Sequence, residues 1–131
     1  MPKDRKSLAH EFLNVLGSGD AKATLSLMTC DPSWAFWGIE RPGTDGVRSI
    51  IAAARSLYKE GSKSWIFEGE YESGDTVIMQ ATLKATTFKG EAYENQYIFF
   101  IHFEGDKVAR VQEASDTAYI EEKFAGWSEP R

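Results

Sequence analysis

One carboxylate, Glu113, stands on a strand face that is otherwise rich in aromatic residues. It lies in the stretch 93–119, YENQYIFFIHFEGDKVARVQEASDTAY, which predicts two long antiparallel strands joined by a tight turn at Glu104–Asp106. A carboxyl group inside an apolar pocket is costly to ionise, so its pKa is expected to rise. Glu113 can then give or take a proton near neutral pH, which is the chemistry of a general acid or base.

Two structural interpretations of Glu113 stay open beside the catalytic one. Tyr97 and Lys84 can hold it as a structural carboxylate, or a different strand register can place it at the rim of the pocket. Glu113 is nevertheless the residue that we expect to carry catalysis.

The hairpin loops predict which residues are neighbours across three strands. A loop at 104–106 and a two-residue loop at Lys89–Gly90 pair Tyr97 with Glu113, Phe99 with Val111, Asn95 with Ser115, Thr82 with Tyr97, and Gln80 with Phe99. Thr82, Tyr97 and Glu113 would then form one row.

Eleven further residues are expected to bind the substrate. The polar ones can orient it through hydrogen bonds or can satisfy Glu113 and buried water, while the apolar ones can offer stacking surface or serve as core. They are Tyr97, Asn95, Thr82, Gln80, Ser115, Trp34, Phe36, Phe99, Trp65, Phe12 and Val111.

The two histidines do not indicate a metal site, since His10 and His102 lack ligand spacing. His102 is also expected to point away from Glu113, so a triad of Ser115, His102 and Asp116 fails on geometry. We therefore expect neither a metal nor another cofactor.

Composition narrows the class of protein. With 131 residues, the chain is expected to form a single domain over 1–131. The net charge of −5 comes without a basic stripe, which argues against nucleic acid as a partner, and no long apolar run predicts a membrane span. The N-terminus lacks a secretory pattern, and the lone Cys30 suits a reducing compartment, so we expect a cytoplasmic protein.

The order of elements predicts an α+β fold. Helical spacing begins at Leu8 and ends near Gly17, a short second helix follows Asp20, and a third, which Thr44 or Asp45 can cap, follows the loop at 41–43. A short aromatic strand at 34–37 precedes the third helix. From Ser64 the period changes to two, which predicts four consecutive antiparallel strands.

The other face of this predicted sheet is apolar. Helices can cover only one face, so we expect a second copy to cover the other in a twofold dimer, unless loops or the C-terminal tail do so. The residues assigned to that face are Val77, Met79, Ala81, Leu83, Ile98, Phe100, Val108 and Ala114. The tail from Tyr119 has partly helical spacing, typical of a lid over the pocket or of a segment that seals the dimer edge.

Together with this order of elements, the Tyr93–Tyr97 run, the Gly-Asp-Lys-Val turn and the closing Glu-Ala-Ser-Asp-Thr resemble the SnoaL-like and ketosteroid isomerase-like families of the nuclear transport factor two-like superfamily. The resemblance covers most of the chain. It implies a strongly curved antiparallel sheet wrapped around three N-terminal helices, shaped as a cone with an internal pocket for a small apolar molecule, usually in a homodimer.

The catalytic groups of two related enzyme types do not carry over. The positions that match the proton-handling residues of ketosteroid isomerases look like Phe12, Phe99 and Phe36, none of which can move a proton. Of the Asp-Arg-Asp set of limonene epoxide hydrolases, only the last position matches, as Glu113; the others fall near Gln80 and Thr82.

SnoaL-like cyclases, for which a single carboxylate can be enough, are the pattern that the chain resembles best. The sequence thus predicts a pocket protein with cofactor-free acid/base catalysis of isomerase, cyclase or hydrolase type on a small apolar cyclic compound. The alternative is a ligand-binding or assembly module of the same fold without catalysis.

Overall fold

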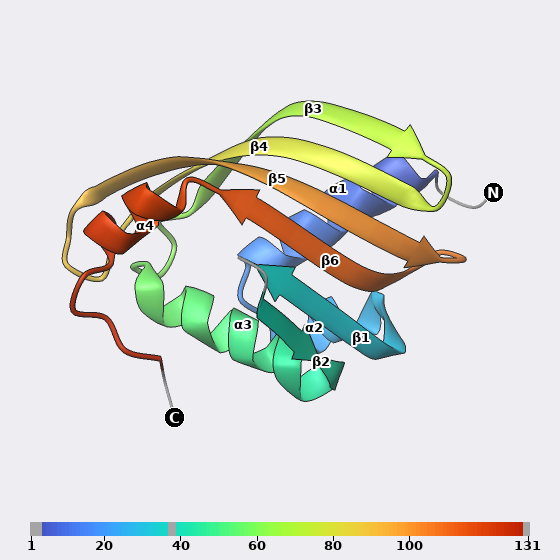
Figure 1. Ribbon diagram of the computed structural model, residues 1–131, viewed down its shortest axis with the longest axis horizontal. Coiled ribbons are helices and arrows are strands. Elements are labelled where there is room, and N and C mark those ends of the chain that lie inside the picture. Colours follow the sequence, from blue (N-terminus) through green and yellow to red (C-terminus); the bar gives the residue numbers. More distant parts are fainter. Residues whose placement is uncertain (1–3, 37–38, 130–131) are drawn as a thin grey trace.

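The computed structural model describes residues 4–36 and 39–129. Helices and strands follow one another in the predicted α+β order, with an additional short strand that starts at residue 39 and a short helix after residue 116 (Figure 1). The elements are α1 (Arg5–Gly17), α2 (Ala21–Ser26), β1 (Met28–Phe36), β2 (Ile39–Pro42), α3 (Gly43–Leu57), β3 (Ser64–Ser73), β4 (Thr76–Thr86), β5 (Ala92–Glu104), β6 (Lys107–Ser115) and α4 (Thr117–Lys123).

A six-stranded sheet in the order β2-β1-β6-β5-β4-β3 arches over α1 and α3 (Figure 1). This confirms the predicted curved sheet wrapped around helices and the antiparallel meander of β3 to β6. The sheet also contains one parallel pair, because β1 lies beside β6 with Trp34 next to Val111 and Phe36 next to Glu113. The parallel pair brings the N-terminal part of the chain to the strand that carries Glu113.

Local sequence explains most of the boundaries. Asp4 and Asp20 cap α1 and α2 by accepting hydrogen bonds from the backbone N–H groups of Ser7 and Ala23. The predicted caps of the third helix are wrong, since α3 starts at Gly43 after Pro42 and has no side-chain cap.

The aromatic strand is longer than predicted. β1 starts at Met28. The register between β1 and β6 shifts between Met28 and Ser33, and Pro32, which has no backbone N–H to donate to the ladder, lies in that stretch. Trp37, which we assigned to this strand, lies outside the described residues. β2 covers the predicted loop at Arg41 and Pro42.

The predicted row of Thr82, Tyr97 and Glu113 is wrong. Glu113 lies opposite Phe99, and Tyr97 lies opposite Ser115, because the last turn is one residue shorter than predicted and a register shift follows at His102–Phe103. The loop between β4 and β5 spans 87–91 rather than two residues, so Tyr97 pairs with Ala81. That one-residue slip turns every side chain of β4 to the other face.

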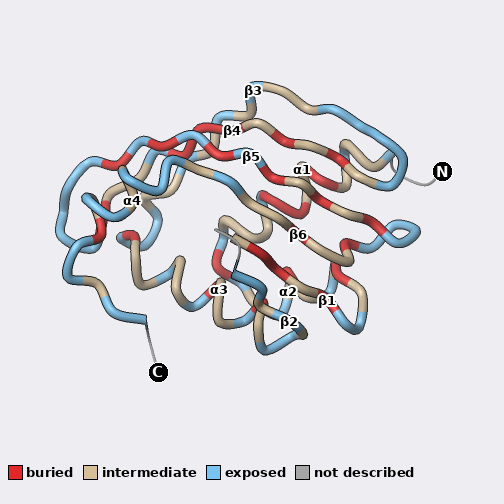
Figure 2. The backbone as a smooth tube through the Cα atoms, in the orientation of Figure 1, coloured by how far each residue is buried: buried red, intermediate tan, exposed pale blue. Residues whose placement is uncertain are grey.

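The slip also changes the face on which we predicted a dimer. Five of the residues assigned there are buried instead: Val77, Met79, Ala81 and Leu83 on β4, and Val108 on β6. Figure 2 shows buried positions along β4 and β5. Ile98 and Ala114 share the outer face with Gln80, while Ile66 and Gln96 pair with Thr82 on that same face. The outer face of the sheet therefore carries both polar and apolar side chains.

No helix in 4–36 or 39–129 has the length and apolarity to cross a membrane.

Candidate functional site

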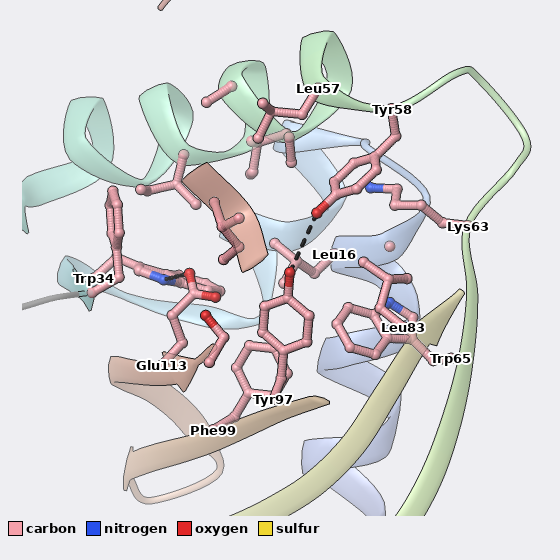
Figure 3. Close-up of a pocket in the computed structure, with 18 of the residues that line it drawn as sticks. Leu16, Trp34, Leu57, Tyr58, Lys63, Trp65, Leu83, Tyr97, Phe99 and Glu113 are labelled. Carbon is pink, nitrogen blue, oxygen red and sulfur yellow. Dashed lines mark hydrogen bonds between the residues drawn. The ribbon is translucent and has the colours of Figure 1, made fainter. Parts of the chain in front are cut away.

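A cavity of about 140 Å³ lies between α3 and the inner face of the sheet (Figure 3). Residues from α1, β1, α3, β3 to β6 and the C-terminal tail contribute to its wall. Most of the wall is apolar, and the polar side chains that face the cavity are few: Tyr58, Lys63, Tyr97, Glu113 and Ser115. An apolar cavity with a few convergent polar groups is the usual form of a site for a small molecule.

Glu113 projects from β6 into this cavity between Phe99 of β5 and Phe36 of β1. The indole Nε1–H of Trp34 donates a hydrogen bond to its Oε1 at 2.8 Å (Figure 3). Burial raises the pKa of Glu113 to about 7, and the hydrogen bond from Trp34 opposes that rise. Glu113 can therefore hold or release a proton near neutral pH.

Three tyrosine hydroxyl groups form a second polar cluster, and two of these tyrosines, Tyr58 and Tyr97, line the cavity. The hydroxyl oxygen of Tyr97 lies 3.3 Å from that of Tyr58 and 2.6 Å from that of Tyr93, which accepts a hydrogen bond from Asn95 Nδ2 at 3.1 Å. Burial raises the pKa of all three tyrosines, so the hydroxyl groups stay protonated at neutral pH. The two hydrogen bonds among these three hydroxyl groups use two of their three protons. The remaining proton can be donated to a bound molecule by Tyr58 or Tyr97, which line the cavity.

The structure brings six of the expected substrate-binding residues to the cavity beside Glu113. They are Trp34, Phe36, Trp65, Tyr97, Phe99 and Ser115.

The other five expected residues do not line this cavity. Thr82 and Gln80 lie on the outer face because of the register slip, and the Thr82 hydroxyl donates to Glu68. Asn95 stands behind Tyr93 and also donates to the backbone oxygen of Asp116 at 3.3 Å. Two more are core residues, Phe12, which stacks on Trp34, and Val111.

Tyr58 and Lys63 were missed as cavity residues by the sequence reasoning. Tyr58 is the first residue after α3. Lys63 is the residue before β3. Side chains alternate between the two faces of a strand, so Lys63 is expected on the same face as Trp65 and Phe67, and this signal could have identified it as a cavity residue.

The C-terminal tail closes one side of the cavity. Asp116 caps α4 by accepting a hydrogen bond from Tyr119 N, and Ile120 and Phe124 line the cavity. Beyond α4, the Trp127 indole donates to Ser56 Oγ on α3 at 2.8 Å. Of the two interpretations of the tail, the position of these residues favours a cover over the cavity.

Metal-ligating side chains do not gather in the described part of the chain, where no group of three or more His, Cys, Asp or Glu is placed to hold an ion. His10 instead bonds to Glu70.

Comparison with known proteins identifies the family and the fold. A model of the SnoaL-like domain family matches residues 9–111. An NTF2-like protein of unknown function from Burkholderia pseudomallei superposes with a TM-score of 0.82 at 16% identity, over 95% of this chain and 100% of that one. A proposed SnoaL-like polyketide cyclase from a Jannaschia species gives a TM-score of 0.77 at 12% identity, over 98% and 99% of the two chains. The sequence matches no curated protein. At these identities, the solved structures establish the fold alone.

Replacing Glu113 by Gln should make the protein more stable above pH 7 and leave it nearly unchanged at pH 4. The carboxyl group has a pKa of about 7 when folded and an ordinary value of 4.5, so between these pH values the folded state holds a proton that the unfolded chain has lost. Wild-type stability therefore falls as the pH rises through this window, by up to about 3 kcal/mol, and Glu113→Gln removes that loss. Urea unfolding of both proteins from pH 4 to 8 measures it. A constant difference between them would contradict the raised pKa.

Trp34→Phe should raise the pKa of Glu113 further, because it removes the hydrogen bond that stabilises the carboxylate. A carbon-13 NMR titration of glutamate-labelled protein measures it, with Glu113→Gln identifying the signal. Trp65→Phe is the matched control: Trp65 also lines the cavity, but its buried Nε1 has no hydrogen-bond partner among the described residues. An equal shift in both variants would mean that loss of packing, and not of the donor, moves the pKa.

Proposed function

The chain belongs to the SnoaL-like domain family, and on that premise we propose that it binds a small, largely apolar cyclic molecule and moves a proton on it with Glu113, without a cofactor. The observation that carries this proposal is the carboxyl group with a pKa of about 7 on the wall of an apolar cavity. A general acid or base works best when its pKa lies near the operating pH.

The tyrosine hydroxyl groups supply the second function that such a reaction needs. The pKa of Tyr58 is raised mainly by burial and in part by the negative charge of Glu113, so the two groups act within the same electrostatic environment. A hydroxyl group that stays protonated can donate a hydrogen bond to a ligand oxygen on which negative charge develops. The cavity thus offers a proton acceptor and a hydrogen-bond donor to one molecule.

This pair suits the removal of a proton from a carbon next to a carbonyl group. The Glu113 carboxylate takes the proton, the electron pair of the C–H bond moves toward the carbonyl oxygen, and a tyrosine hydroxyl donates to that oxygen. Protonated Glu113 can return the proton to another carbon, which is an isomerisation. Alternatively, the carbon can attack the carbon of a second carbonyl group in the same molecule, which closes a ring, and the oxygen of that carbonyl group takes the proton from Glu113.

The second candidate is a ligand-binding or assembly module without catalysis. It is favoured by the aromatic residues at the positions that match the catalytic residues of ketosteroid isomerases: Phe36 and Phe99 flank Glu113 on both sides. With aromatic residues at those positions, Glu113 would be the single carboxylate available for every proton transfer, which is a demanding role for one group.

Deuterium exchange at carbon next to a carbonyl group tests the proposed chemistry before the natural substrate is known. The protein should accelerate exchange of 2-indanone in D₂O near pD 7.5, and Glu113→Gln should slow the protein-dependent rate by about a hundredfold or more, as removal of a general base does. Proton NMR measures the rate. Ser115→Ala is the control, since Ser115 lines the same cavity and has no role in the proposed proton transfer.

Two outcomes separate the candidates. Loss of exchange in Glu113→Gln, with the thermal stabilisation by 2-indanone retained, supports acid/base catalysis. Stabilisation by 2-indanone with no exchange above the buffer rate in the wild type would favour the binding module.

We also propose that the protein is a cytoplasmic homodimer that associates through the outer face of the sheet. Ile66 and Ile98 are 45% and 42% exposed on this face, which supports contact with a second copy. Cys30 is free and exposed, as suits a reducing compartment.

Ile98→Glu should convert the dimer to a monomer, because it places a charge at the centre of the proposed contact. Sedimentation velocity at micromolar concentration measures the mass. Ile39→Glu is the control, since Ile39 is 48% exposed on β2, away from that face. A wild-type protein that sediments as a monomer would refute the proposed interface.

A further inference from the structure

Lys63 places a cation on the wall of the cavity. Its Nζ lies 5.6 Å from the centroid of the Tyr58 ring, and Figure 3 shows its side chain beside Tyr58, away from the end of the cavity that holds Trp34 and Glu113. Among residues 4–36 and 39–129, neither an ion pair nor a hydrogen bond engages the Nζ of Lys63. A positive charge therefore faces the cavity opposite the end with the proton-transfer group.

Several other basic side chains of the described chain do have carboxylate partners. Arg5 pairs with Asp75 at 2.7 Å, and Arg110 pairs with Glu40 at 2.9 Å; further pairs are Arg41 with Glu129, Lys84 with Glu94 and Lys89 with Glu91. The chain as a whole carries a net charge of −5, so acidic side chains are abundant. The lack of an acidic partner for Lys63 within the described part of the chain is thus not explained by a shortage of acids.

Leaving Lys63 unpaired has an energetic cost. The side chain is half-buried, and burial together with the charge of nearby Arg55 lowers the pKa of its amine. Contact with the Tyr58 ring offsets part of this cost, since the face of an aromatic ring attracts a cation electrostatically. A negatively charged group at this place would relieve the unfavourable desolvation and the repulsion from Arg55.

The size of the cavity limits what that group can belong to. A dry cavity of roughly 150 Å³ holds one benzene molecule, and the cavity here measures about 140 Å³. The space inside the cavity therefore fits one six-membered ring, and the open side of the cavity leaves room for further atoms of a ligand. A substituent on that ring can reach the lysine while the opposite side of the ring approaches Glu113.

We propose that Lys63 determines substrate class: it binds an anionic group, such as a carboxylate, on a cyclic ligand whose ring lies in the cavity and whose opposite side faces Glu113. The inference rests on the proposed function in using the same cavity, and it adds a requirement for negative charge. The competing explanation is a structural role, in which the apolar stem of Lys63 covers the edge of Tyr58 and its amine only remains in contact with water.

Ligand-observed fluorine NMR with 4-fluorobenzoate and 4-fluorobenzamide distinguishes these explanations. The two probes share a ring and differ in charge. The wild type should bind the benzoate more tightly, and Lys63→Met, which keeps an apolar stem, should weaken benzoate binding about tenfold and change benzamide binding less than about twofold. Lys63→Arg should keep most of the benzoate affinity.

Lys59→Met is the matched control, because Lys59 is an exposed lysine on the same loop that does not line the cavity. Thermal unfolding of each variant confirms that the protein is folded. Equal loss of both probes in Lys63→Met, or no loss of either, would overturn the role of the charge while leaving the Glu113 chemistry standing. If neither probe binds to the wild type, the cavity is not a site for such rings, and both this inference and the proposed function fall.

Discussion

The hydrogen bond between the Trp34 indole and the Glu113 carboxyl group is the interaction on which the candidate site depends. It is possible because β1 lies parallel to β6, which places Trp34 beside Val111 and Phe36 beside Glu113. Without that donor, burial would favour the neutral form of the carboxyl group more strongly and raise its pKa further. With it, burial and hydrogen bonding balance at a pKa of about 7, and the group can exist in both protonation states.

The sequence placed Glu113 correctly on the inner face, because its register to β5 differs from the predicted one by two residues, which leaves the side chain on the same face. Between β4 and β5 the register differs by one residue, which changes the face. Tyr97 was placed correctly on the inner face, but Thr82 and Gln80 were not, because a five-residue loop replaced the expected two-residue loop. The length of the loop and the register shift at His102–Phe103 depend on local backbone geometry. The residue types in these turns do not predict that geometry.

The remaining polar groups of the cavity come together only in the folded chain. Tyr58 and Lys63 flank the loop after α3, whereas Tyr93 and Tyr97 belong to β5, and no spacing in the sequence links the two pairs. Their functional significance lies in their combination. A buried carboxyl group, two tyrosine hydroxyl groups and a lysine amine line one small apolar cavity, which offers a ligand more than one point of contact.

The parallel pairing of β1 with β6 has a consequence for how the protein folds. Trp34 and Glu113 are separated by 79 positions, so their contact closes one of the longer loops of the chain. Contacts of high sequence separation form slowly, since the entropy of loop closure must be lost before they contribute stability. The meander of β3 to β6 joins strands that are neighbours in the chain, whereas β1 and β6 join residues that lie far apart in it. The burial that raises the pKa of Glu113 is therefore a property of the complete fold and not of the β5–β6 hairpin alone.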